Sequence, residues 1–397
     1  MTSRLKTTLL LASVLLTGCE TYNLERPRTT LDTQKQTELI NRSEVIAIVG
    51  SADIAADLEQ QAAHWGYDLK RKETLDGLDL YLLTFDCPPG IDPHVASLEL
   101  ERLQPHSTVE ANHKYTLQAT KTSVSYLNKQ APRKYANTLI NWPNDGCESL
   151  FNVGIIDGGV DSASLVRDSS SNIISRRFTS GHEASEAKAH GTAIAEILIG
   201  VGRLKNAKLY NASVISKDSA GVQYSGVEPM LKALNWMVQS DVRVVNISLA
   251  GPYNRTLDRG IQRAIGKGLI IVAAVGNEGA LSEPLYPAAY EGVIAATAVD
   301  SDARIYSRAV RGRHVDVAAP GVEVFVGDDR SGRYVSGTSI AAPFVVAKIA
   351  ADHRYADVKT ADDVREILVQ EVVDLGEAGA DRVYGAGLIH TNKSCRT

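Results

Sequence analysis

The larger, C-terminal part of the chain alternates short apolar runs with helical patterns. Apolar runs occupy residues 151–156, 208–215, 242–249, 269–275 and 291–299, and helical spacing occupies residues 190–201, 226–239 and 256–266. The runs lack the polar alternation of a strand with one face in water, and helices separate them, which is typical of a parallel sheet covered on both faces. We therefore predict an α/β domain of three layers over residues 148–397, with a mostly parallel central sheet.

The block at residues 44–118 has a different pattern. Strand candidates lie at 44–50, 67–72, 78–85 and 107–117, and helical spacing lies at 53–66 and 92–103. The order βαββαβ predicts a small α+β domain of the ferredoxin-like type, with helices on one face of an antiparallel sheet. Residues 119–147 are polar and loosely patterned, so we predict a linker there.

The first 19 residues have the pattern of a targeting segment. Arg4 and Lys6 precede an apolar stretch at 9–16 that is too short to span a bilayer, which predicts an export signal over residues 1–18. Residues 16–19 (LTGC) resemble a bacterial lipobox, which implies cleavage before Cys19 and attachment of a lipid to its sulfur. The alternative is an ordinary signal peptide with an incidental cysteine. Residues 19–43 are polar and predict a flexible tether.

Composition and charge narrow the function classes. Of 397 residues, 44% are hydrophobic and 22% are charged, which is the composition of a globular protein. A net charge of −5 does not indicate the basic surface that nucleic-acid binding requires, so we set that function aside. An exported protein enters an oxidising compartment, where a disulfide between Cys147 and Cys395 could link the two ends of the larger domain. The sequence leaves open whether they pair or stay free thiols.

Three residues carry candidate chemistry. Asp157 ends an apolar strand candidate, His190 opens a helical pattern, and Ser339 lies among small residues where a helix can begin. Each alone is ordinary, because aspartate, histidine and serine often cap helices or turns. Together they supply a hydroxyl nucleophile, an imidazole base and a carboxylate that orients the imidazole. Their order along the chain is the one found in subtilisin.

Residues 152–389 resemble the subtilisin-like serine protease family. The likeness is carried by residues 157–160 (DGGV), 190–192 (HGT), 245–251 (VNISLAG), 318–321 (AAPG), 337–343 (GTSIAAP) and 384–389 (YGAGLI). It implies the triad above, Asn277 as an oxyanion-hole donor, and a substrate-binding edge at Ser248, Leu249, Ala250, Gly251 and Gly276. Such a site cleaves extended stretches of protein or peptide, which bind as an added strand.

Two features limit what the resemblance carries over. Gly158 stands where the family usually has serine or threonine, and Ala250 replaces a usual glycine and adds a methyl group at the substrate edge. The chemistry requires no cofactor. The sequence leaves structural calcium open but does not support it, because no string matches the family's calcium ligands.

The block at 44–118 resembles the pro-domain of these proteases, which assists folding and blocks the site until it is cut away. We expect the enzyme to cut its own chain between about Leu117 and Asn144. An unrelated binding domain is the alternative. Other functions also stay open, namely a dedicated self-processing factor and a peptide-binding pseudoprotease. The export signal predicts that the protein lies in the bacterial cell envelope. If there are two membranes, Glu20 favours a lipid anchor in the outer membrane, with the protein facing the periplasm.

Overall fold

The computed structural model describes residues 39–40, 43–117, 135–179, 185–218, 221–328, 332–391 and 395. The predicted signal, Cys19 and most of the predicted tether lie outside these residues. Within the described ranges, no helix combines the length and the apolar character that crossing a membrane requires.

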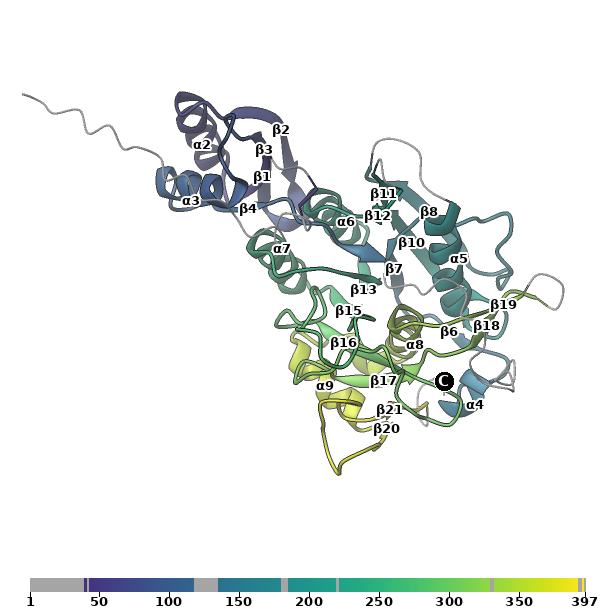
Figure 1. Cartoon of the computed structure of the whole chain (residues 1–397). Helices are drawn as coiled ribbons and strands as arrows, with labels where there is room; N and C mark the ends of the chain where they lie inside the picture. Colours follow the sequence, from purple (N-terminus) through teal and green to yellow (C-terminus); the bar gives the residue numbers. More distant parts are fainter. Residues whose placement is uncertain are drawn as a thin grey trace, which may run out of the picture.

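The N-terminal unit is a four-stranded antiparallel sheet with the strand order β2-β3-β1-β4. Helices α2 and α3 pack on one face of the sheet (Figure 1). The elements are β1 (Glu44–Val49), α2 (Ala52–His64), β2 (Asp68–Leu75), the 3₁₀ turn η1 (Asp76–Leu78), β3 (Leu80–Asp86), α3 (Pro93–Leu103) and β4 (Thr108–Ala111). Ser51 and Asp92 cap the two helices by accepting hydrogen bonds from Ile54 N and His94 N.

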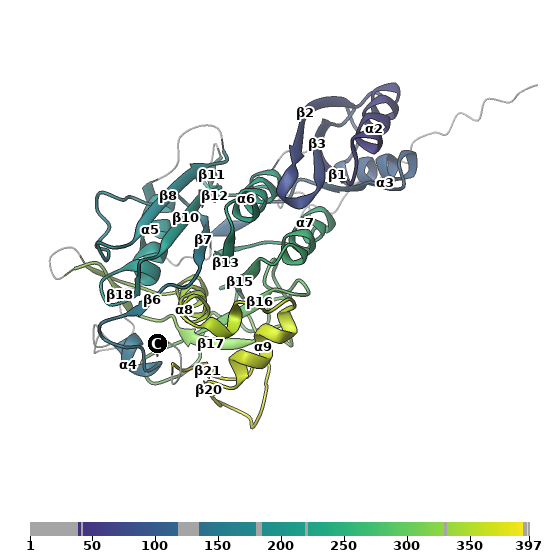
Figure 2. The same cartoon turned by 180° about the vertical axis from the view of Figure 1, so that it is seen from behind.

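Both faces of β1, in the middle of this small sheet, are apolar and belong to different cores. Along β1, Val45, Ala47 and Val49 pack against α2 and α3. Ile46 and Ile48 point the other way and join a core made with helices α6 (Val227–Gln239) and α7 (Arg255–Gly266) of the larger unit. Figure 2 shows these two helices between the small sheet and the large one. The N-terminal unit therefore completes its packing only against the larger unit.

The larger unit is built on a nine-stranded sheet with the order β20-β21-β17-β16-β15-β13-β7-β10-β8. All neighbouring strands run parallel except the edge pair β20 and β21. The strands are β7 (Asn152–Asp157), β8 (Asn172–Arg177), β10 (Lys208–Ser213), β13 (Val242–Ile247), β15 (Ile270–Ala274), β16 (Ile294–Val299), β17 (Val317–Pro320), β20 (Val372–Val373) and β21 (Leu388–Ile389). The predicted fold class, an α/β fold of three layers around a mostly parallel sheet, is confirmed.

Alternate residues of the central strands point to opposite cores. Val244 and Val272 pack toward α5 (Ser185–Ile199) and α8 (Thr338–Ala350), whereas Val245 and Ile271 pack toward α6 and α7. The remaining elements are β5 (Thr116–Leu117), α4 (Tyr135–Leu139), β6 (Cys147–Glu148), β9 (Leu204–Lys205), β11 (Ser216–Lys217), β12 (Gln223–Tyr224), β14 (Leu249–Ala250), β18 (Val324–Val326), β19 (Arg333–Val335), η2 (His353–Tyr355) and α9 (Ala361–Val369).

Three boundaries differ from the sequence predictions. The strand predicted at 107–117 stops at Ala111, and residues 116–117 pair instead with β14 of the larger unit. Residues 135–147, predicted as linker, pack in the core beside α5 through Tyr135, Ile140 and Trp142. Helix α5 begins at Ser185, so His190 lies inside the helix and does not open it. These segments are short or depend on distant partners, so local patterns did not reveal them.

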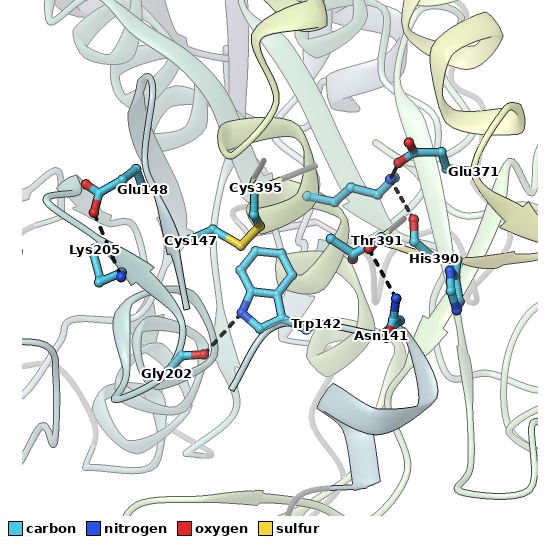
Figure 3. Close-up of a disulfide and its surroundings, with 11 residues drawn as sticks. Asn141, Trp142, Cys147, Glu148, Gly202, Lys205, Glu371, His390, Thr391 and Cys395 are labelled. Carbon is cyan, nitrogen blue, oxygen red and sulfur yellow. Dashed lines mark hydrogen bonds and ion pairs between the residues drawn. A yellow bond between two sulfur atoms is a disulfide. The ribbon is translucent and has the colours of Figure 1, made fainter. Parts of the chain in front are cut away.

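A disulfide joins Cys147 to Cys395, which are 248 residues apart (Figure 3). Trp142 Nε1 donates to Gly202 O over 3.1 Å beside it, and Thr391 N donates to Ile140 O over 2.8 Å. Cys87 is a buried free thiol in the N-terminal unit. The bond thus ties the start of the larger unit to the end of the chain.

We expect loss of this bond to lower the free energy of unfolding by about 2–4 kcal/mol, because a long closed loop restricts the unfolded chain. The measurement is urea unfolding of Ser339→Ala protein, which avoids self-digestion, with and without reductant. The Cys147→Ala/Cys395→Ala double variant is the control, and it should not respond to reductant. Equal stability of the oxidised and reduced protein would contradict the prediction.

Candidate active site

The structure brings Asp157, His190 and Ser339 together in one hydrogen-bonded row. His190 Nδ1 lies 2.8 Å from Asp157 Oδ1, and His190 Nε2 lies 3.0 Å from Ser339 Oγ. Asp157 is the last residue of β7, His190 comes from α5, and Ser339 is the second residue of α8. Asp157 and Ser339 have no exposed surface, and His190 is 7% exposed. Ligand sites of parallel sheets form where strands end, as here.

The row fixes the roles of the imidazole nitrogens. A carboxylate accepts hydrogen bonds, so His190 Nδ1 carries a proton and donates a hydrogen bond to Asp157. His190 Nε2 then has a lone pair directed at the Ser339 hydroxyl. The arrangement can therefore take a proton from Ser339 Oγ and make that oxygen a nucleophile.

The backbone after Asp157 packs closely against Ala187 of α5. Gly158 N donates to Asp157 Oδ1 over 2.6 Å. A Cβ at Gly158 would lie 2.1 Å from Ala187 O, so no larger residue fits there. The usual hydroxyl at this position is therefore missing for a steric reason, and Asp157 Oδ2 has no hydrogen-bond partner among the described residues.

Asn211 supports the same loop, and the sequence reasoning missed it. It is buried in the middle of β10, and its amide fits between Gly158 O and Val160 N, each 3.1 Å away, when it donates to the first and accepts from the second. The available signal was an amide side chain directly between Tyr210 and Ala212 in a strand candidate. We assign Asn211 a positioning role, because it contacts the loop and not the reacting atoms.

Asn277 lies beside the first turn of α8. Its Oδ1 accepts hydrogen bonds from Thr338 N over 3.1 Å and from Thr338 Oγ1 over 3.0 Å. These bonds leave Nδ2 as the donor end of the amide. Gly276, just before it, has a φ of +104°, and a Cβ there would lie 2.5 Å from Leu285 Cδ1, so this turn requires glycine.

The predicted substrate edge is a strand, and the chain's own segment occupies it. Strand β14 pairs antiparallel with β5, with Leu249 opposite Leu117 and Ala250 opposite Thr116. Ser248 Oγ donates to Ser339 O over 3.3 Å, which links this edge to the start of α8. Gly251 does not continue this ladder, because its N–H donates to Tyr286 O over 2.9 Å. The methyl group of Ala250 does not prevent strand pairing.

Comparison with known proteins identifies the family. The model of the subtilase family matches residues 149–387. The chain belongs to the subtilase family. It is 31% identical to subtilisin DY of Bacillus licheniformis over 262 residues, covering 62% of this chain and 90% of that protein. It is 27% identical to a thermostable alkaline protease of Halalkalibacterium halodurans over 331 residues, covering 78% of this chain and 84% of that protein.

The fold of this subtilase is also similar to a solved structure. Fervidolysin from Fervidobacterium pennivorans, a keratinolytic enzyme related to subtilisin, matches with a TM-score of 0.66 and 19% identity, over 88% of this chain and 60% of that one. The predicted enzyme class, a subtilisin-like serine endopeptidase, is confirmed. Among the described residues of this subtilase, no group of three or more His, Cys, Asp or Glu side chains is placed to hold a metal ion.

In this subtilase we expect Asn277→Ala to lower kcat by about 10² to 10³ and to change KM little, because the amide would act mainly on the charge that develops in the transition state. That magnitude comes from the same substitution site in a subtilisin. The measurement is steady-state hydrolysis of a peptide substrate. A rise in KM with unchanged kcat would contradict the prediction.

Proposed function

We propose that the chain is a self-processing endopeptidase that works through the Asp157, His190 and Ser339 triad and an acyl-enzyme. Ser339 Oγ attacks the scissile carbonyl carbon while His190 Nε2 takes the hydroxyl proton, and Asp157 stabilises the imidazolium. Asn277 Nδ2 and the backbone N–H of Ser339 hold the oxyanion. The C–N bond then breaks, and His190 returns the proton to the leaving amine. Water repeats the attack on the ester and releases the acid.

The observation that carries this proposal is the position of residues 113–117. Tyr115 exchanges two backbone hydrogen bonds with Ser225, of 2.9 and 2.7 Å, and β5 pairs with β14 on its other side. The segment therefore has backbone partners on both sides, β14 on one and Ser225 on the other, as an added peptide strand has. Because the pair is antiparallel, β5 ends on the side of β14 where Ser248 contacts Ser339.

The N-terminal unit also completes the helix that lies beside this segment. Helix α6 begins after Gly226, which has no side chain to cap it. Asn112 Oδ1 accepts the hydrogen bond from Val227 N over 3.1 Å and supplies the missing cap. A cap provided by another unit favours a pro-domain that assists folding of the larger unit.

Ion pairs reinforce the same contact. Arg71 binds Glu228 of α6 through two nitrogens at 2.8 and 3.0 Å. Arg255 of α7 binds Glu101 and Glu110 at 3.0 and 3.1 Å. The similarities to the Halalkalibacterium protease and to fervidolysin extend beyond residues 149–387, which also supports a pro-domain.

Mass spectrometry of the expressed protein tests the proposal. We expect one cut soon after Leu117, within residues 118–134, and cleavage of unfolded casein by the matured protein. Maturation without casein cleavage would favour a dedicated self-processing factor. An intact chain that cleaves casein would contradict self-processing.

Acid should weaken the hold of the pro-segment. Burial, with a smaller contribution from His94, lowers the pKa of His113 from 6.5 to about 4. His113 Nδ1 lies 2.8 Å from Asn254 Nδ2 and must stay unprotonated to accept that hydrogen bond. The centres of the His94 and His113 rings are 5.6 Å apart, and His94 Nδ1 lies 3.8 Å from Glu110 Oε1. Between pH 6.5 and 4 the released segment binds a proton that the docked one does not, so docking weakens as pH falls.

We expect release of the cut pro-segment to be on the order of tenfold faster at pH 5 than at pH 7. The measurement is the onset of casein cleavage after a pH jump. His113→Gln keeps an acceptor without the titration and should flatten the profile. The same steepness in that variant would assign the effect to other groups.

We also propose that the protein is exported and tethered to a membrane of the bacterial cell envelope through lipid on Cys19, with the catalytic unit facing the periplasm if there are two membranes. The lipobox-like residues 16–19 support this. Cys19→Ser should release the protein from the membrane fraction. An unlipidated Cys19 in the mature wild-type protein would overturn the anchor.

A further inference from the structure

Lys114 of the pro-segment lies in a groove beside the substrate edge. Lys114 and Thr116 face this groove, which has a volume of about 670 Å³, together with Ala250 and Gly251. Lys114 Nζ lies 3.1 Å from Asp218 Oδ2 and 5.1 Å from the centre of the Tyr224 ring. The Lys114 and Asp218 side chains are 23% and 22% exposed, so this pair is largely shielded from water.

The partners of Lys114 belong to the catalytic unit and are held in place without the segment. Asp218 Oδ1 accepts a hydrogen bond from Val222 N over 2.9 Å, and Asp218 N donates to Val222 O over 3.0 Å. Tyr224 lies in β12, which pairs with β11 directly before Asp218. The carboxylate and the ring should therefore keep their positions when the pro-segment leaves.

The groove favours positive charge more generally. Two further carboxylates, Glu278 and Glu283, line it, and among its described lining residues Lys114 is the only cation. A carboxylate attracts an ammonium or guanidinium group, and the face of a tyrosine ring adds a cation–π contact. An acidic side chain in the same place would meet like charge.

We infer that Asp218 and Tyr224 form a subsite for a lysine or arginine side chain of the substrate. The subsite takes the residue two positions before the one that pairs with Ala250, as Lys114 stands two positions before Thr116. The inference rests on the proposed peptidase function and adds a specificity determinant to it. Lys114 stands in for the substrate side chain, since its strand pairs with the edge as a substrate strand would.

Quenched fluorescent peptides test the subsite. The first peptide has the sequence of residues 113–122, HKYTLQATKT, and three others replace only its second residue with Arg, Ala or Glu. For the matured wild-type protein we expect kcat/KM for Lys and Arg to exceed that for Ala by about 3- to 10-fold, and Glu to be lowest. Asp218→Asn should bring the four peptides within about twofold of one another, and Asp218→Lys should favour Glu over Lys. Each comparison is made on one enzyme, so a general loss of activity cancels.

Asp362→Asn is the matched control, because it removes one negative charge from a side chain that is 86% exposed and does not line the groove. It should keep the wild-type order of peptides. Equal cleavage of all four by the wild type, or a preference for Lys that survives Asp218→Asn, would overturn the subsite. Casein cleavage measured in parallel separates the two claims. Cleavage of casein with equal rates for the four peptides would contradict only the subsite. No cleavage of casein or of the peptides would contradict the peptidase function and the subsite with it.

Discussion

Ser339→Ala is expected to lower kcat by about 10⁶ and to leave the expressed chain uncut after Leu117. The substitution removes the only hydroxyl that lies 3.0 Å from His190 Nε2 among the described residues, so no nucleophile remains to form the ester. The magnitude is the one measured for loss of the serine in a subtilisin. Casein hydrolysis gives the rate, and intact mass gives the processing state.

A serine elsewhere in the larger unit provides the control. Ser164 is an exposed serine whose hydroxyl, among the described residues, bonds within its own turn to Asp161 O, so Ser164→Ala should process and cleave as the wild type does. Normal maturation of Ser339→Ala expressed in a protease-deficient host would show that the nucleophile lies elsewhere.

Asp157→Asn is expected to lower kcat by about 10⁴, the size measured for the equivalent exchange in trypsin. The amide would offer an N–H to His190 Nδ1, and the imidazole would then carry its proton on Nε2. In that tautomer Nε2 cannot accept the Ser339 proton. Asp157 Oδ1 also accepts the Gly158 N–H over 2.6 Å, so an amide nitrogen in its place would lose that bond as well.

The matched control is Asp161→Asn, four residues further along the same segment. The Asp161 side chain is 41% exposed and interacts with Lys188, so its loss should change kcat by less than about twofold. Steady-state kinetics on one peptide compare the three proteins. An Asp157→Asn enzyme within tenfold of wild type would contradict the assigned role of the carboxylate.

The sequence was informative where function depends on short strings. Asp157, His190 and Ser339 each lie within a string whose neighbours fix the local backbone, so the three could be chosen before their contact was known. The layers of the sheet followed from apolar runs such as 242–249, because a strand buried on both faces leaves that pattern. The structure places His190 within hydrogen-bonding distance of both Asp157 and Ser339.

The sequence was uninformative where a segment depends on a distant partner. Residues 107–117 read as one strand, yet Ala111 and Thr116 pair in different sheets because the partner of Thr116 is Ala250. Asn112 gave no sign that it caps α6, and Asn211 was one of several polar positions within residues 208–215. Contacts between residues that lie far apart in the chain leave no local pattern to read.

A fluorophosphonate probe tests the central claim, because such probes bond covalently to a serine oxygen only where a base and an oxyanion site have activated it. The matured protein is labelled, digested and mapped by mass spectrometry, and the control is His190→Ala protein cut after Leu117 by an added protease. We predict one labelled residue, Ser339, and no label in His190→Ala. Label on another residue, or casein cleavage by protein that takes up no label, would contradict the assignment of Asp157, His190 and Ser339 as one catalytic unit.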